Sequence, residues 1–334
     1  MHNIFSHRLF RIYDWWEYKI PQILIPIYLV ILNTDYLISS TNSLKIFLQL
    51  LLGVVLGALT ISIMGEFFDI EQDSLANKKN GFENLNQKQT PIVLLTTVAI
   101  NIIFLFFLEK STLVFYLLSI ITFILYYSPF IRLKEKGILG VIADSLGSHV
   151  FPSIFVFLCL IPIEDILKFK YSIFLFWVFL FGIRGILNHQ YTDLENDKKS
   201  NTNTFVRTSS RLTKKILQKI VLSLEIIFFI LLLISTVPLN LISFSLLLYL
   251  LVLFGRKMLY NNAIVYFNIR IDRAFTIFLF EFYSIFFPLL LIIQIYTINQ
   301  TAFWGILILH IIITLKRVIT ILKELKESLN YILQ

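Results

Sequence analysis

The sequence is poor in the residues that carry much of the chemistry of soluble proteins. Only 15% of its 334 residues are charged, glycine and proline number 11 and 8, and cysteine occurs once, as Cys159 in an apolar run. A single cysteine excludes an intramolecular disulfide and any metal centre built from several cysteines. The apolar residues form continuous runs rather than an alternating pattern, which excludes a transmembrane β-barrel.

What the chain has in abundance is leucine, isoleucine and phenylalanine. Hydrophobic residues make up 57% of it, and the mean hydropathy is +0.79. A transmembrane helix needs about 20 consecutive, mostly apolar residues. Runs of about this length lie near 20–38, 44–66, 90–108, 112–130, 139–163, 171–190, 216–237, 239–255, 274–296 and 301–320. We therefore predict an all-α fold, a polytopic transmembrane helical bundle of about nine to ten spans, forming one integral membrane domain over residues 1–334.

The basic character of the chain, with a net charge of +8 and a pI near 9.4, has two explanations. It could indicate a nucleic acid partner, but the positive-inside rule explains it better. With a cytoplasmic N-terminus and alternating spans, Arg184 falls within a span, and the basic residues on the outer side are Lys45, Lys110, Lys168 and Lys170. We expect a protein of the lipid bilayer, of the bacterial inner membrane type, without a nucleic acid partner.

Two acidic segments share the pattern DxExD. They are Asp69-Ile-Glu-Gln-Asp73 and Asp193-Leu-Glu-Asn-Asp197, they begin 124 positions apart, and each follows a long apolar run. Carboxylates are costly near lipid and usually mark a cavity, an ion path or a bound cation. Both segments fall at the cytoplasmic ends of their spans, with four helices between them. This spacing predicts two related four-helix units in parallel, around a central cavity open to the cytoplasm.

Carboxylates at positions i and i+4 of a helix lie on one face, with Cβ atoms roughly 5–6 Å apart. Mg²⁺ prefers oxygen ligands and is usually held by one or two carboxylates together with phosphate oxygens of a substrate. We interpret Asp69 with Asp73, and Asp193 with Asp197, as two Mg²⁺ sites for a diphosphate. A single DxxxD segment is more often a solvated helix end, but two copies on equivalent helix ends favour the metal.

Basic residues accompany the acidic segments on the cytoplasmic side. A diphosphate held between metal ions and such side chains is stabilised as its charge grows on leaving. The same residues also satisfy the positive-inside rule, so each has a purely topological explanation as well. The candidates for diphosphate binding are Lys78, Lys79, Arg132, Lys134 and Arg207.

Three motifs together resemble the UbiA superfamily of intramembrane prenyltransferases, over residues 20–297. Glu66-x-x-Asp69-x-x-x-Asp73 resembles the first aspartate-rich motif of that superfamily, NDxxDxxxD. Gln190-x-x-Asp193-x-x-x-Asp197, with Thr204 and Val206-Arg207 after it, resembles the second motif, DxxDxxxD…T-x-V-R. Between them, Tyr126-Tyr-Ser-Pro129, Arg132-Leu-Lys134 and Gly137 are similar to the Y-S-P…R-L-K…G loop of the family.

The chain departs from the family pattern at three places. Gly65 stands where the family has asparagine, Glu66 replaces the following aspartate, and Gln190 replaces the leading aspartate of motif two. Glu66 can still be a metal ligand, whereas Gln190 offers only a neutral oxygen. The segment 298–334 lies outside the resemblance, and we expect it to form an extra span followed by an amphipathic tail at the inner surface.

The resemblance implies transfer of a prenyl group from a polyprenyl diphosphate to a lipid-soluble or membrane-surface acceptor, with Mg²⁺, two ions in all, as the cofactor. The aspartates Asp69, Asp73, Asp193 and Asp197 would then be the catalytic metal ligands. Four further residues are candidates for lining the substrate cavity, namely Tyr127, Arg184, Asn188 and Tyr191. Aromatic faces can stabilise an allylic cation. For Arg184, Asp144 is a candidate ion-pair partner, since a buried arginine usually pairs with an acid.

Two other functions stay open at this point. A terpene cyclase of the same superfamily would use the same ionisation but close a ring instead of transferring the prenyl group. An ion-coupled transporter could also use intramembrane carboxylates. Against transport, the acids gather at one face rather than at the midplane, and the sequence lacks the pair of broken helices typical of secondary transporters.

Overall fold

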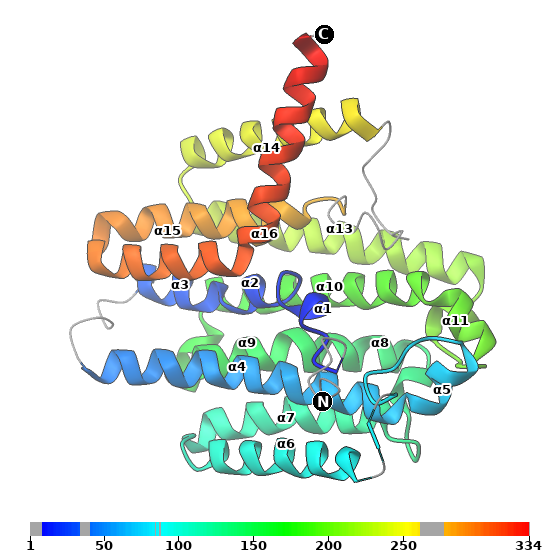
Figure 1. Cartoon of the computed structure of the whole chain (residues 1–334). Coiled ribbons are helices and arrows are strands. Elements are labelled where there is room, and N and C mark those ends of the chain that lie inside the picture. The colour runs from blue at the N-terminus through cyan, green and yellow to red at the C-terminus, as the bar shows by residue number, and fades with distance from the viewer. Residues whose placement is uncertain (1–8, 34–40, 84, 87, 261–276, 334) are drawn as a thin grey trace.

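The structure is a computed structural model that describes residues 9–33, 41–83, 85–86, 88–260 and 277–333. These residues form helices joined by short loops, as expected where lipid forces the backbone to satisfy its hydrogen bonds within each segment (Figure 1). Within the described part, seven helical segments are long and apolar enough to cross a membrane. They are α4 (Thr41–Phe68), α7 (Lys110–Tyr127), α8 to α9 (Ile138–Leu158), α10 (Phe169–Thr192), α13 (Arg211–Thr236), α14 (Leu239–Tyr260) and α16 (Gln300–Leu333).

Shorter helices complete the chain. They include three apolar segments. The first is α2 (Ile20–Ile23) followed by α3 (Ile25–Asn33), the second is α6 (Gln89–Leu105), and the third is the π-helix η5 (Phe282–Phe286) continued by α15 (Phe287–Ile298). The short connecting elements are α1 (Ile12–Trp15), α5 (Ile70–Leu75), α11 (Leu194–Lys199), α12 (Phe205–Thr208) and the 3₁₀ helices η1 (Leu133–Glu135) and η3 (Ile163–Leu167). Each predicted apolar run contains one of these helices, although parts of the runs 20–38 and 274–296 lie outside the described residues.

The helices lie side by side, and α10 occupies the centre of the packing (Figure 1). Its Trp177 has a tilted contact with Phe229 of α13 and an edge contact with Tyr283 of η5, at ring centroid distances of 5.4 and 5.1 Å. Trp177 and Tyr283 are fully buried. The protein is thus an integral membrane helical bundle with an aromatic core, as its composition predicts.

A π-helix, η2 (Leu146–Val150), interrupts the segment between α8 (Ile138–Ser145) and α9 (Phe151–Leu158). Gly182 of α10 faces this turn, and a Cβ atom on it would lie 2.4 Å from the Ser145 hydroxyl oxygen. That hydroxyl donates to the Phe179 carbonyl of α10 at 2.6 Å. The glycine therefore allows α8 and η2 to approach the central helix closely.

The C-terminal helix α16 includes the predicted span over 301–320 and continues as one helix to Leu333, over the residues of the predicted amphipathic tail. Its buried face carries the polar residues His310, Arg317 and Glu324, which are seven positions apart. His310 contacts the Tyr28 hydroxyl of α3 at 3.2 Å, and Glu324 accepts from Arg256 of α14 at 2.9 Å. The N-terminal half of α16 follows α15, and its C-terminal half turns away and crosses α14 (Figure 1). Polar contacts between helices thus fix the position of α16.

Candidate active site

The first acidic segment forms a sharp junction between a long and a short helix. α4 ends at Phe68, Asp69 precedes α5, and the Asp73 amide donates to the Asp69 carbonyl at 2.8 Å. One helical turn therefore separates the two aspartates, as the i, i+4 spacing predicts. The Asp73 carboxylate is buried and accepts a hydrogen bond from the Asn80 amide at 2.7 Å. The Asp69 carboxylate accepts from the Lys134 ammonium.

The second acidic segment repeats this geometry at an offset of 124 residues. α10 ends at Thr192, Asp193 precedes α11, and the Asp197 amide donates to the Asp193 carbonyl at 2.8 Å. Thr204, the counterpart of Asn80, donates to the Asp197 carboxylate at 2.7 Å. Both segments are followed by an asparagine in the left-handed region, Asn77 with φ 55° and Asn201 with φ 57°. Asparagine tolerates this region better than most residues, so the sequence supports the same turn twice.

The residues preceding each aspartate also correspond. Glu66 of α4 accepts a hydrogen bond from the Gly81 amide at 2.5 Å, and Gln190 of α10 accepts one from the Val206 amide at 3.1 Å. Each side chain fastens the loop that follows its own acidic segment. The carboxylate of Glu66 is thereby engaged with the protein, and Gln190 serves the same purpose with a neutral oxygen.

The two acidic segments lie at the same end of the bundle and face each other, as the neighbouring positions of α5 and α11 illustrate (Figure 1). The Lys78 ammonium lies 3.8 Å from a carboxylate oxygen of Asp73 and 3.8 Å from one of Asp193. The two carboxylate oxygens are therefore separated by at most twice that distance. A single cation already bridges the two motifs in this structure.

The electrostatic environment differs between the carboxylates. Burial raises the pKa of Asp73, against the opposing effects of the Asn80 hydrogen bond and the Lys78 charge. Burial also raises the pKa of Asp197, to about 6. Burial acts in the same direction on Asp193, but its pKa lies below the usual value because His189 and Lys78 favour the carboxylate. The site thus concentrates negative charge, which a bound cation stabilises.

The donor set suits Mg²⁺. Within the described residues, no three or more Asp, Glu, His or Cys side chains are gathered around one point as a ready metal cage. Mg²⁺ does not require such a cage, because it is usually bound by one or two carboxylates, by water and by phosphate oxygens of a substrate. The aspartates of the two segments provide hard oxygen ligands of this kind, and the lysines lying against them mark where positive charge is favoured.

The basic candidates occupy different positions around the acids. Lys134 is buried against Asp69, and its ammonium lies 5.6 Å from the centre of the Tyr127 ring. Arg207 donates to the Asp197 carbonyl at 3.1 Å and to the Asn201 side chain at 2.5 Å.

Two of the basic candidates lie further from the acids. Arg132, in the left-handed region at φ 49°, pairs with Glu135. Lys79 is exposed beside Lys78. The structure therefore brings Lys78, Lys134 and Arg207 to the acidic segments and leaves the side chains of Arg132 and Lys79 in other surroundings.

The four predicted cavity residues also differ in their surroundings. Tyr127 adjoins the acidic end, and a Cβ atom on Gly65 would lie 3.0 Å from its hydroxyl oxygen, which explains the glycine at a position where the related family has asparagine. Asn188 is buried near the end of α10, and Tyr191 is half-buried there. Arg184 differs from expectation, because its partner is Glu225 of α13 at 2.6 Å rather than Asp144, and the pair is fully buried.

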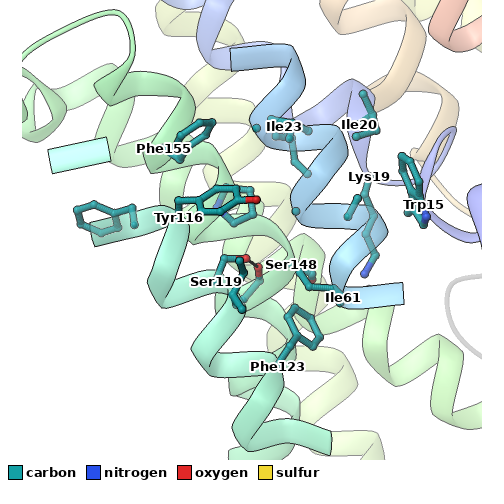
Figure 2. Close-up of a pocket in the computed structure, with 18 of the residues that line it drawn as sticks. Trp15, Lys19, Ile20, Ile23, Ile61, Tyr116, Ser119, Phe123, Ser148 and Phe155 are labelled. Atoms are coloured by element: carbon teal, nitrogen blue, oxygen red, sulfur yellow. Dashed lines mark hydrogen bonds between the residues drawn. The ribbon is translucent and has the colours of Figure 1, made fainter. Parts of the chain in front are cut away.

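An apolar cavity lies between α2, α4, α7 and the η2–α9 segment, and sequence reasoning did not identify the residues that line it (Figure 2). Small residues on α4, namely Gly53, Gly57 and Ala58, line it, and their spacing of one helical turn was the available signal. Aromatic and polar side chains close the remainder, and Figure 2 shows how they surround the space. They include Trp15, Lys19, Ser62, Phe115, Tyr116, Ser119, Phe123, Ser148 and Phe155.

Comparison with known proteins gives consistent results. The chain matches the UbiA prenyltransferase family over residues 24–285. A UbiA homologue from Archaeoglobus fulgidus, solved with GPP and Mg²⁺, has a TM-score of 0.57 at 14% identity, covering 88% of this chain and 98% of that one. The same homologue solved with DMAPP and Mg²⁺ has a TM-score of 0.57 at 15% identity, covering 86% and 98%. No curated protein matches the chain.

Proposed function

The chain belongs to the UbiA prenyltransferase family, and from this we propose that it transfers a prenyl group from a polyprenyl diphosphate to an acceptor, with Mg²⁺ bound at the two aspartate-rich segments. The observation that carries the proposal is the position of Lys78, between Asp73 and Asp193. Two acidic segments that begin 124 residues apart can bind one diphosphate only if they face each other. Here one ammonium group lies within 3.8 Å of both segments. The homologue from Archaeoglobus fulgidus, solved with GPP or DMAPP and Mg²⁺, has the same fold.

In this proposal Asp69, Asp73, Asp193 and Asp197 would hold two divalent ions, and the chemistry that these ions would supply is neutralisation of the diphosphate charge and polarisation of its oxygens. Glu66 completes the predicted ligand set only if it leaves the Gly81 amide. Lys78, Lys134 and Arg207 already lie against the acids and would turn to the phosphate oxygens, with Lys79 and Arg132 at the margin. The prenyl chain would occupy the apolar cavity, whose wall includes Phe123 and Tyr116.

The chemical step is a heterolytic cleavage. The bond between the allylic carbon and the diphosphate oxygen breaks, and its electron pair leaves with the diphosphate, where the lysines and arginines stabilise the growing charge. The allylic cation then bonds to a nucleophilic carbon or oxygen of the acceptor, which loses a proton. Tyr127 lies near Lys134 and Gly65 at the acidic end, and it stacks on Phe123, which lines the cavity. These two rings offer aromatic faces that would stabilise the cation.

The proposal also covers the orientation of the protein in the membrane and the arrangement of its helices. The excess of lysine and arginine in the loops next to the acidic segments supports a cytoplasmic mouth, in a membrane of the bacterial inner membrane type. The correspondence of Asp69 with Asp193, Asn77 with Asn201 and Asn80 with Thr204 supports two related four-helix units in parallel. The cavity between α2, α4 and α7 would open toward that mouth.

The test is an assay of diphosphate release from radiolabelled geranyl diphosphate by the purified protein in lipid nanodiscs. We expect release with Mg²⁺, loss of release with EDTA, and a drop of about 100-fold or more in an Asp69→Asn/Asp193→Asn variant. Glu71→Gln/Glu195→Gln is the matched control, because both glutamates lie on the same two turns but are exposed. Full turnover by the aspartate variant would refute the proposal.

The same assay separates transfer from cyclisation. If the prenyl chain is recovered only as a cyclic hydrocarbon or alcohol, the protein is a cyclase. If adding membrane lipids or candidate phenolic and hydroxylic acceptors yields a prenylated product, it is a transferase.

A further inference from the structure

The N-terminal segment Leu9–Ile23 contacts both the acidic end of the bundle and the apolar cavity. It precedes residue 24, where the match to the family begins, so the family assignment gives it no role. Leu9 is buried with Ile63 and Phe82 in a small cluster at the start of the loop that follows the first acidic segment. A Cβ atom on Gly81 would lie 2.7 Å from the Leu9 Cα atom. The beginning of the segment is thus packed directly against that loop.

Two residues further on, Arg11 reaches Glu66, one helical turn before the first acidic segment. Its guanidinium lies 3.7 Å from the Glu66 carboxylate, whose other oxygen holds the Gly81 amide. The backbone of Arg11 has φ 46° and ψ 32°, a left-handed conformation that is unfavourable for residues other than glycine. Arg11 therefore holds its positive charge beside Glu66, one helical turn before Asp69.

The same segment then forms a wall of the cavity. The Trp15 indole donates to the Phe10 carbonyl at 2.9 Å, which closes the turn after Arg11. Trp15, Lys19, Ile20 and Ile23 line the cavity opposite α7 and α9 (Figure 2). A molecule that filled the cavity and reached the acidic segments would therefore lie along this segment for its whole length.

The other side of the segment is held by α16, which also lies outside the family match. The Arg317 guanidinium lies 3.8 Å from the Glu17 carboxylate and 5.0 Å from the centre of the Tyr18 ring. It also stacks over Phe280 at 4.6 Å, and its side chain is only 4% exposed. A buried arginine with both ionic and aromatic partners fixes the position of what it contacts.

We propose that Leu9–Ile23 is a strap that covers the bound substrate, in which Arg11 binds the diphosphate beside the first acidic segment and α16 holds the strap in place through Arg317. The proposal rests on the proposed function. A guanidinium suits this role because it can donate two parallel hydrogen bonds to a phosphate. With diphosphate bound, Arg11 would exchange Glu66 for a phosphate oxygen.

The test compares Arg11→Gln and Arg11→Lys with the wild type in nanodiscs, using geranyl diphosphate and Mg²⁺. We expect Arg11→Gln to raise KM about tenfold and to weaken inhibition by inorganic diphosphate by the same factor, with kcat changed less than about threefold. Arg11→Lys should recover part of both effects. Lys199→Gln is the matched control, because it removes one exposed positive charge next to the second acidic segment. A purely structural role for Arg11 would not change KM and the inhibition constant together.

A second measurement uses the wild-type protein and does not depend on turnover. Trypsin can cleave after Arg11, and inorganic diphosphate with Mg²⁺ should protect that bond several-fold if the strap closes over the ligand. Unchanged KM and inhibition in Arg11→Gln, or the same cleavage rate with and without diphosphate, would overturn the strap. A wild type that binds and is protected but releases no diphosphate from geranyl diphosphate would instead overturn the proposed function.

Discussion

The position of Lys78 leads to a counter-intuitive prediction. Removing its positive charge should strengthen the binding of Mg²⁺ and weaken the binding of the prenyl diphosphate. In the structure its ammonium occupies the space between Asp73 and Asp193, where a divalent ion would also be favoured. Mg²⁺ must displace it. A Lys78→Met variant should therefore bind Mg²⁺ more tightly in the absence of substrate, and bind the prenyl diphosphate more weakly.

The size of the effect follows from the two contacts. Each places opposite charges 3.8 Å apart, which corresponds to about 4 kcal/mol at an effective dielectric constant of 20. The side chain is 40% exposed, and exposed pairs contribute only about 0.2–1 kcal/mol once solvent and side-chain entropy are counted. Two such pairs give about 0.4–2 kcal/mol, or a gain of roughly 2- to 30-fold in Mg²⁺ affinity. The loss of a charged partner for the diphosphate should raise its KM by about tenfold.

The assay for the metal is calorimetric titration of Mg²⁺ into the nanodisc-embedded variant without substrate, and the assay for the substrate is the KM for geranyl diphosphate. Lys199→Met controls for the general loss of one positive charge, because Lys199 is exposed on α11. An equal gain in Mg²⁺ affinity in both variants would mean that net charge alone is responsible. Unchanged or weaker Mg²⁺ binding in Lys78→Met would refute the idea that the lysine and the metal share one position.

Three further predictions follow from individual groups. Because burial raises the pKa of Asp197 to about 6, a cation must displace a proton at lower pH. Calorimetry should therefore find that the affinity for Mg²⁺ is about fourfold weaker at pH 5.5 than at pH 7.5. If the affinity does not change over this range, Asp197 is not a metal ligand. Arg184→Met should destabilise the protein by about 3–5 kcal/mol because it leaves Glu225 buried without its partner, and the Arg184→Met/Glu225→Met variant should recover much of this in thermal unfolding. Arg317→Leu should raise the KM for geranyl diphosphate and speed tryptic cleavage after Arg11 in the metal-free protein; if both stay at the wild-type value, α16 does not hold the strap.

The sequence was most informative where a physical constraint is local. Lipid requires continuous apolar runs, so each predicted run overlaps a helix of the structure, and the family was identified from the carboxylates at i, i+4 with their flanking motifs. The contacts between distant helices were not accessible in this way. Arg184 and Asp144 lie near the same boundary, which favours an ion pair between them. In the structure Arg184 instead donates a hydrogen bond to Glu225, 41 positions further along the chain. Nothing in hydropathy distinguishes these two partners.

The burial of polar residues in α16 was inaccessible for a related reason. Lys316, Arg317, Lys323 and Glu324 follow the apolar run and predict that the last helix continues as an amphipathic tail, and α16 does continue to Leu333. Arg317 and Glu324 are buried, because each meets an opposite charge on another element. Such compensation is invisible in a one-dimensional profile. The spacing of seven between His310, Arg317 and Glu324 was the signal that these polar residues share one face.

The repeat of 124 residues shows which parts of the site are duplicated and which are not. Backbone turns and their supports correspond, since Asn80 and Thr204 both donate to the second aspartate of their own segment. At the position of Lys78, however, the second segment has Thr202, so only one half supplies the bridging cation. The two half-sites therefore hold similar carboxylates in different electrostatic environments. Burial is the main reason why the pKa of Asp73 is raised. Burial acts the same way on Asp193, but its pKa is lowered because nearby positive charges outweigh that effect. In the proposed function, a duplicated scaffold with a single bridging lysine would bind an asymmetric ligand in one orientation. A prenyl diphosphate requires this if its allylic carbon is to lie toward the cavity and its terminal phosphate toward the proposed cytoplasmic mouth.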